Sequence, residues 1–136
     1  MSDEFAEERS MPDQEARREA LLDLIRLRKP IDVAVRSLAG YPWDSQGLVE
    51  LRIADIENAL SAYEAGLISE AGLEAWAKEL EGRDDIDLEQ QNESTLKEFL
   101  FEASTPEVNG QFDHSRLANW KERLGSTFDY VKAGTT

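Results

Sequence analysis

The sequence contains no cysteine and only one histidine, His114, among its 136 residues. Without cysteine there are no disulfides, no thiolate ligands for zinc and no thiol nucleophile, and a reducing cytoplasm is the expected compartment. A single histidine closes many routes of general acid–base catalysis near neutral pH. Phosphate-binding glycine loops and nucleophile elbows do not occur either. The sequence therefore predicts no catalytic residue, no cofactor and no metal ligand.

Long apolar segments are also missing from the sequence. No run approaches the length that spans a bilayer. Residues 1–8 are acidic, whereas a secretory signal begins with basic residues and continues with apolar ones. We therefore expect a cytoplasmic protein that does not contact membranes.

Acidic residues, by contrast, are abundant. Asp and Glu number 29 against 15 Lys and Arg, and the net charge is −14. Such a surface repels the phosphates of nucleic acids and of anionic lipids, so neither is an expected partner. A basic protein or peptide is the partner that this charge favours. Hydrophobic residues still make up 40% of the chain, enough to form the core of one ordinary domain.

Apolar residues recur at helical spacing through most of the chain. They predict an all-α fold, a single domain of five to six helices packed as an irregular, partly antiparallel bundle. Residues 1–9 are predicted to form a flexible acidic tail, residues 10–126 the helical domain, and residues 127–136 a loose C-terminal end.

Local signals place the first helices. The first helix is expected to begin at Ser10 or Asp13, both good N-cap residues. Residues 31–39 allow two interpretations, because their apolar positions fit both an alternating strand and a helix that follows Pro30. We favour the helix, since no convincing second strand exists for a strand to pair with.

Residues 53–81 are predicted to form a helical hairpin with a very short connection. Gly66 ends its first helix in a left-handed conformation. Ser69 caps the second helix, with Ile68 and Leu73 in the positions of a hydrophobic staple. The short connection makes the two helices antiparallel neighbours.

The same staple arrangement is expected near the end of the chain. After a helix around residues 96–103, Asp113 is predicted to cap the last helix, with Phe112 and Leu117 as its staple. His114 then lies in the first turn of this helix, where we expect it to be exposed.

The negative charge is concentrated in residues 69–93, which hold nine acidic residues and two basic ones, a net charge of −7. This is half of the charge of the whole chain. The acidic residues predicted to bind a partner here are Glu74, Glu81, Asp84, Asp85, Asp87 and Glu89.

Three interpretations of this acidic segment compete. A calcium loop would use the alternate spacing of Asp85, Asp87 and Glu89, but Gln90 stands where an EF-hand needs glycine and Leu96 where it needs the closing glutamate. A carboxylate pair for glycoside hydrolysis lacks any other feature of such a site. The third interpretation is a solvated acidic edge, either without function or used for docking.

The aromatic residues allow similar alternatives. Trp76 and Trp120 lie on apolar helix faces and are predicted to be core residues. Trp43, in a proline turn, either covers the core or is a docking anchor. Phe101 falls off the main apolar stripe of its helix and faces either a second neighbour or a contact surface. Trp43 and Phe101 are therefore added to the predicted partner-binding residues.

Two resemblances extend these predictions. The first is to a family of small bacterial helical proteins without an assigned function, and it rests on Pro42-Trp43-Asp44, Leu48-Val49, Leu51, Asp55, Leu60, Tyr63, Gly66, Ser69, Trp76-Ala77, Leu80-Glu81, Arg83-Asp84-Asp85-Ile86, Leu96-Lys97-Glu98, Pro106-Glu107 and Asn109-Gly110. The second concerns the helical hairpin around Gly66-Leu67-Ile68-Ser69, which is similar to that of small helical immunity proteins of the colicin type. This likeness implies an acidic inhibitor that covers the basic active site of a nuclease toxin.

These observations lead to three functional hypotheses. The leading one is an acidic protein-interaction module, an immunity-type inhibitor that binds a basic partner such as a nuclease toxin. The first alternative is a structural or adaptor subunit of a bacterial complex without an inhibitory role. The second is a carboxylate-based metal-binding protein or enzyme. The sequence leaves the oligomeric state open.

Overall fold

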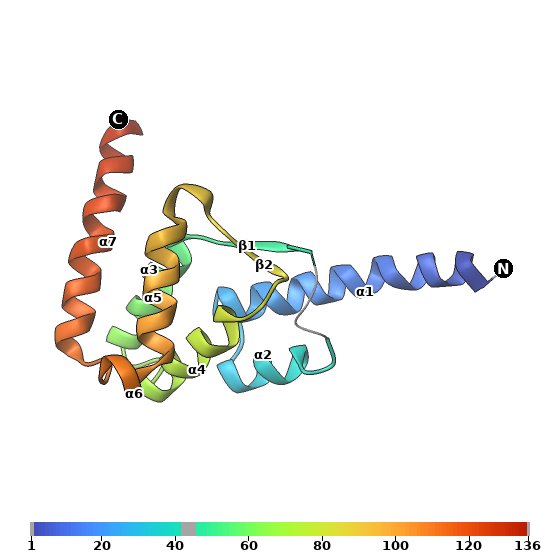
Figure 1. Ribbon diagram of the computed structural model, residues 1–136, viewed down its shortest axis with the longest axis horizontal. Coiled ribbons are helices and arrows are strands. Elements are labelled where there is room, and N and C mark those ends of the chain that lie inside the picture. Colours follow the sequence, from blue (N-terminus) through green and yellow to red (C-terminus); the bar gives the residue numbers. More distant parts are fainter. Residues whose placement is uncertain (1, 42–45, 136) are drawn as a thin grey trace.

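The computed structural model describes the backbone of residues 2–41 and 46–135 and the side chains of residues 14–41 and 46–125. This part of the chain is mostly helical and contains one small parallel sheet (Figure 1). The elements are α1 (Ser2–Ile25), α2 (Ile31–Leu38), β1 (Val49–Leu51), α3 (Ile53–Glu64), α4 (Glu70–Glu81), β2 (Ile86–Leu88), the 3-10 turn η1 (Gln90–Asn92), α5 (Glu93–Ser104), α6 (Pro106–Asn109) and α7 (His114–Thr135). The predicted all-α class is confirmed.

The described residues form seven α-helices, one more than the upper limit of the prediction. The additional helix is α6, a single turn that has Pro106 at its N-terminal end. Proline suits the first turn of a helix because its missing N–H would have no partner there. Thr105, with a φ of −129° and ψ of 65°, separates α6 from α5.

The two terminal helices are longer than predicted. α1 begins at Ser2, before Ser10 and Asp13, so its helical backbone runs through the segment expected to be a tail. Acidic residues near a helix N-terminus stabilise the helix dipole, and the first eight residues include four of them. α7 likewise continues to Thr135, through the segment expected to be loose. In Figure 1 the N-terminal half of α1 extends away from the other elements.

The ambiguous residues 31–39 form a helix, as favoured above. α2 follows Pro30 and buries Ala34 and Leu38. α2 packs against α1 and α4, which cover its apolar side chains.

The predicted hairpin forms between α3 and α4. Gly66 has a φ of +78°, and the N–H of Leu67 donates to the carbonyl of Ala62 at 2.8 Å, closing the end of α3. Ser69 caps α4 by accepting a hydrogen bond from the N–H of Gly72 at 3.0 Å. The two helices are not each other's main neighbours, however: α4 packs most extensively against α5, and α3 packs more against α7 than against α4.

One apolar core joins the helices. Trp76 is fully buried, and its indole N–H donates to the carbonyl of Leu24 at 2.8 Å, which joins α4 to α1. Trp120 is also buried and packs edge-on against Phe99. Both tryptophans are therefore core residues, as predicted. The exposed position of His114 is likewise confirmed.

The small sheet was missed by the sequence prediction. β1 and β2 pair in parallel, with Val49 opposite Ile86 and Glu50 opposite Asp87. Side chains alternate along each strand, so that Val49 and Ile86 are buried while Glu50 and Asp87 are exposed. The sheet lies beside α1 in Figure 1. Its exposed positions are those of Glu50 and Asp87.

Candidate functional site

Four of the six predicted acidic residues, Asp85 among them, are engaged within the chain. Glu74 forms an ion pair with Lys78 at 2.7 Å, one turn along α4. Glu81 accepts a hydrogen bond from the Ser104 hydroxyl at 3.0 Å. Glu89 accepts from the N–H of Ile53 at 3.2 Å and from the Asn92 amide at 2.8 Å, so it supports the start of α3.

Asp85 contradicts the prediction that it belongs to an exposed docking surface, because its side chain is fully buried. Arg83 donates to both of its oxygens, at 2.9 and 3.0 Å. Arg17, from α1, donates to Oδ2 from Nε at 2.9 Å, and its Nη2 lies 2.8 Å from the same oxygen. A carboxylate leaves water only when such partners replace its hydration. Asp85 therefore has a structural role.

The cluster around Asp85 pairs carboxylates with guanidinium groups. Arg83 is itself buried, and it also donates to Glu79 at 3.1 Å. Two guanidinium groups and two carboxylates thus meet beneath the connector between α4 and α5. Burial acts to raise the pKa of Asp85, but the hydrogen bonds and charges of Arg83 and Arg17 outweigh it and hold the pKa below its ordinary value.

Asp84 and Asp87 remain available at the surface. Both are exposed, and neither forms an ion pair or a side-chain hydrogen bond with any described residue. Glu50, which the sequence prediction missed, lies directly opposite Asp87 in the sheet. Facing strands run about 4.8 Å apart, so two carboxylates share one small patch. We call Glu50, Asp84 and Asp87 the acidic face.

Like charges opposite each other destabilise a pair of strands. Arg52 relieves part of this repulsion, since its Nε lies 2.9 Å from the Glu50 carboxylate. Asp87 has no such cation among the described residues. The acidic face is therefore a place where an external positive charge would lower the electrostatic energy of the folded protein.

A glycine lies beneath the Asp87 carboxylate. A Cβ atom at Gly47 would stand 2.0 Å from Asp87 Oδ2, so the carboxylate lies directly over the backbone there. Gly47 also borders an open pocket of about 350 Å³ between α1 and β1, lined by Gln14, Glu15, Arg18, Gln46, Gly47 and Leu48. The acidic face thus adjoins a hollow large enough to receive a side chain of a partner.

The predicted aromatic anchors have different outcomes. Phe101 is 45% exposed on α5, so no second helix covers it. It is separate from the acidic face in the sequence. Trp43 lies outside the described residues. Among the residues that can be placed, the partner-binding prediction therefore gains Glu50 and loses Asp85.

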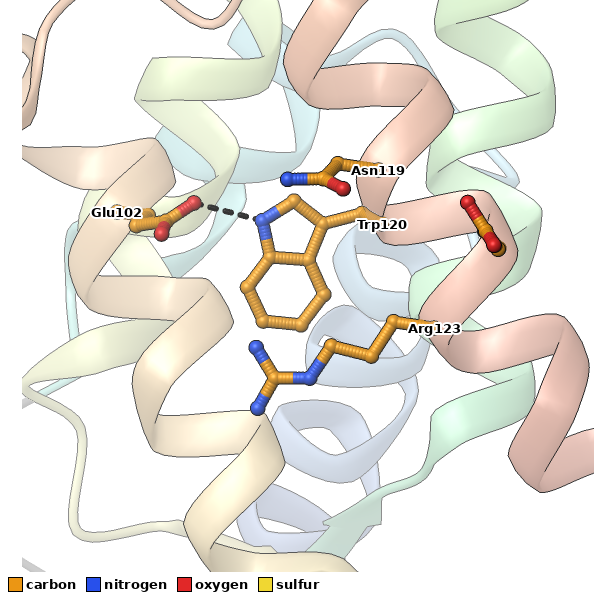
Figure 2. Close-up of a pocket in the computed structure, with 5 residues that line it drawn as sticks. Glu102, Asn119, Trp120 and Arg123 are labelled. Carbon is orange, nitrogen blue, oxygen red and sulfur yellow. Dashed lines mark hydrogen bonds between the residues drawn. The ribbon is translucent and has the colours of Figure 1, made fainter.

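A second, larger pocket of about 470 Å³ lies between α5 and α7. Figure 2 shows the Trp120 indole between Asn119 and Arg123, with Glu102 beside its N–H. The indole N–H donates to Glu102 at 2.6 Å, and the Arg123 guanidinium lies 4.5 Å from the ring centre. Glu102 also pairs with Arg116 at 3.3 Å. These contacts hold α7 against α5.

In the described ranges, no three His, Cys, Asp or Glu residues are grouped so that they could hold a metal ion. None of the helices in this part of the chain combines the length and the apolar character needed to cross a bilayer. No family model, curated protein or solved structure matches the sequence.

Proposed function

We propose that this protein is an acidic interaction module that binds a basic protein through the acidic face. Its specific role in this proposal is that of an immunity-type inhibitor of a nuclease toxin. The observation that carries the proposal is the register of the sheet, which pairs the two exposed acidic residues Glu50 and Asp87.

The electrostatics of the acidic face support a basic partner. Repulsion between Glu50 and Asp87 is a cost that the free protein bears, and a lysine or arginine of a partner would remove it. Complementary charge also accelerates association and disfavours acidic competitors. The net charge of −14 extends this attraction beyond the contact itself.

The choice of a nuclease as the partner rests on the hairpin likeness described above. A nuclease that binds phosphate carries a basic active site, because cationic side chains supply most of the affinity for nucleic acid. An acidic protein of this size that covered such a site would exclude the substrate.

The test compares two triple variants with the same change in net charge. The first removes the acidic face as Glu50→Gln, Asp84→Asn and Asp87→Asn. The matched control removes three exposed acids elsewhere, as Asp32→Asn, Glu107→Gln and Glu122→Gln. Tagged wild-type protein captures its partner from native cells, and the affinity of that purified partner is then measured for each variant.

We expect the acidic-face variant to bind the partner at least about tenfold more weakly, a loss of about 1.4 kcal/mol, and the control to bind nearly as the wild type does. Equal weakening in both variants would mean that only net charge matters. Unchanged binding in the first variant would mean that the partner uses another surface. For the inhibitory role, wild-type protein should suppress nuclease activity of the partner and the acidic-face variant should suppress it less.

A further inference from the structure

Arg17 on α1 contacts two other parts of the chain, one of which is the connector between α4 and α5 (residues 82–92). Its guanidinium binds Asp85, and it also lies 5.5 Å from the centre of the Tyr41 ring, which follows α2. Only 11% of its side chain is exposed. One and two turns further along α1, Leu21 and Leu24 are fully buried in the core. Arg17 thus projects from a part of α1 that the core holds in place.

The backbone of Asp85 is hydrogen-bonded to the start of β1. Its backbone carbonyl accepts hydrogen bonds from the N–H groups of Leu48, at 2.8 Å, and Val49, at 3.4 Å. These bonds set the register between β1 and β2. Because side chains alternate along a strand, a shift by one residue would turn Asp87 inward and expose Ile86. The position of Asp85 therefore decides whether Asp87 lies on the outer face.

Arg83 does not provide the same constraint. It is two residues from Asp85 and belongs to the same connector, so the two side chains can move together. Arg17 is 68 residues away and comes from another element. The guanidinium of Arg17 ties the connector to α1.

We propose that Arg17 is a positioning residue for the acidic face. Through Asp85 it holds the connector in the register that keeps Asp84 and Asp87 exposed and places Asp87 beside Glu50, ready for a basic partner. This inference rests on the proposed function for its binding consequence, but its structural consequence is measured separately.

The test uses Arg17→Met in the full chain, with Arg36→Met as the matched control. Arg36 is on α2 and its side chain is 74% exposed. Both variants make the protein more negative by one charge, which by itself would tighten binding to a basic probe. If Arg17 positions the acidic face, Arg17→Met should instead weaken binding to the probe, whereas Arg36→Met should not. The probe is a decalysine peptide, and hydrogen exchange of the amides of residues 86–89 is measured in parallel.

We expect Arg17→Met to bind decalysine roughly threefold more weakly than wild type and to exchange its connector amides faster. Arg36→Met should neither weaken decalysine binding nor speed amide exchange. Arg17→Lys keeps one charged donor, so its affinity and exchange rate should lie between those of Arg17→Met and wild type. The lysine variant also decides the matter if the methionine variant does not fold. Connector exchange that stays at the wild-type rate in both Arg17 variants would overturn the positioning role.

The two proposals fail in different ways. If the acidic-face triple variant binds decalysine as wild type does, the proposed function is wrong at this surface, while the exchange rates still decide the role of Arg17. If the triple variant loses binding but Arg17→Met binds as tightly as Arg36→Met, the acidic face stands and the positioning role does not.

Discussion

Asp84 and Asp85 are consecutive residues of one connector, yet the first carboxylate is exposed and the second is fully buried. Asp85 faces inward onto Arg17 and Arg83, whereas Asp84 has no ion pair with a described residue. A count of charge along the sequence treats these two residues alike. Their difference shows that the acidic segment has a structural inner side and an available outer side.

The same division continues through β2. Ile86 is buried like Asp85, and Asp87 is exposed like Asp84, so two buried residues lie between two exposed ones. On the inner side each carboxylate has a guanidinium partner. On the outer side Asp87 instead lies opposite another acidic residue, Glu50, in the register of the sheet. The inner side therefore contributes stability, and the outer side costs some.

The largest expected effect is at Arg83. Arg83→Met removes two hydrogen bonds to Asp85 and one to Glu79, and leaves a buried carboxylate with one guanidinium instead of two. Loss of one partner of a buried ion pair costs about 3–5 kcal/mol. We expect a decrease of this size in the free energy of unfolding, measured by urea denaturation.

The exposed Arg36, which pairs with Asp32 on α2, is the comparison for this measurement. Surface pairs of this kind contribute about 0–1 kcal/mol. If Arg83→Met and Arg36→Met lowered the free energy of unfolding equally, the distinction between the inner and outer charges would be wrong.

A smaller effect, which depends on pH, is expected at Asp85. Asp85→Asn keeps the shape of the side chain but loses its charge, and hydrogen bonds to charged groups contribute about 1.5–3 kcal/mol. Because the pKa of Asp85 is lowered in the folded state, its contribution is fully present above the ordinary carboxyl pKa of about 3.9. It is lost as the pH falls through the lower pKa of the folded protein.

The difference in unfolding free energy between wild type and Asp85→Asn should therefore be largest near neutral pH and shrink below about pH 4. Urea denaturation at a series of pH values measures it. Asp84→Asn provides the outer-side control, and its difference from wild type should stay close to zero throughout. A difference for Asp85→Asn that grew on acidification would contradict the pairing within this cluster.

Signals that depend on neighbours in the sequence predicted the structure well. Gly66, Ser69 and Asp113 were each placed at a helix end, and each lies there. The N–H of Arg116, for example, donates to the Asp113 carboxylate at 3.0 Å. Caps and left-handed stops are set by a few adjacent residues, so the sequence alone contains the information that they need.

One local signal failed, because α1 begins at Ser2 and not at Ser10 or Asp13. The other parts that failed depend on residues far apart in the chain. β1 and β2 have three residues each and lie on either side of the α3–α4 hairpin, so neither has a periodic pattern of its own. Glu50 was not included in the predicted acidic segment because it lies outside residues 69–93, and only the pairing of the strands places it opposite Asp87. Asp85 was assigned to the surface because its partner Arg17 is 68 residues away. The sheet, the place of Glu50 and the burial of Asp85 are all set by tertiary contacts, which a local sequence pattern does not show.

The smallest expected effect has the opposite sign and concerns the outer side. Asp87→Thr replaces a repelling carboxylate by a β-branched side chain of similar size, which suits a strand and still fits over Gly47. Removal of a like-charge pair across strands should raise the free energy of unfolding by about 0.2–1 kcal/mol.

Asp84→Thr removes the same charge from a residue that lies outside both strands, and its stability should change by less than about 0.5 kcal/mol. Both variants should bind decalysine more weakly than wild type, because each removes one carboxylate of the acidic face. Thermal and urea denaturation measure the first quantity and peptide titration the second. If Asp87→Thr is more stable than wild type and binds decalysine more weakly, the repulsion between Glu50 and Asp87 lowers stability in return for binding. Loss of stability in Asp87→Thr would instead mean that this carboxylate, like that of Asp85, supports the fold.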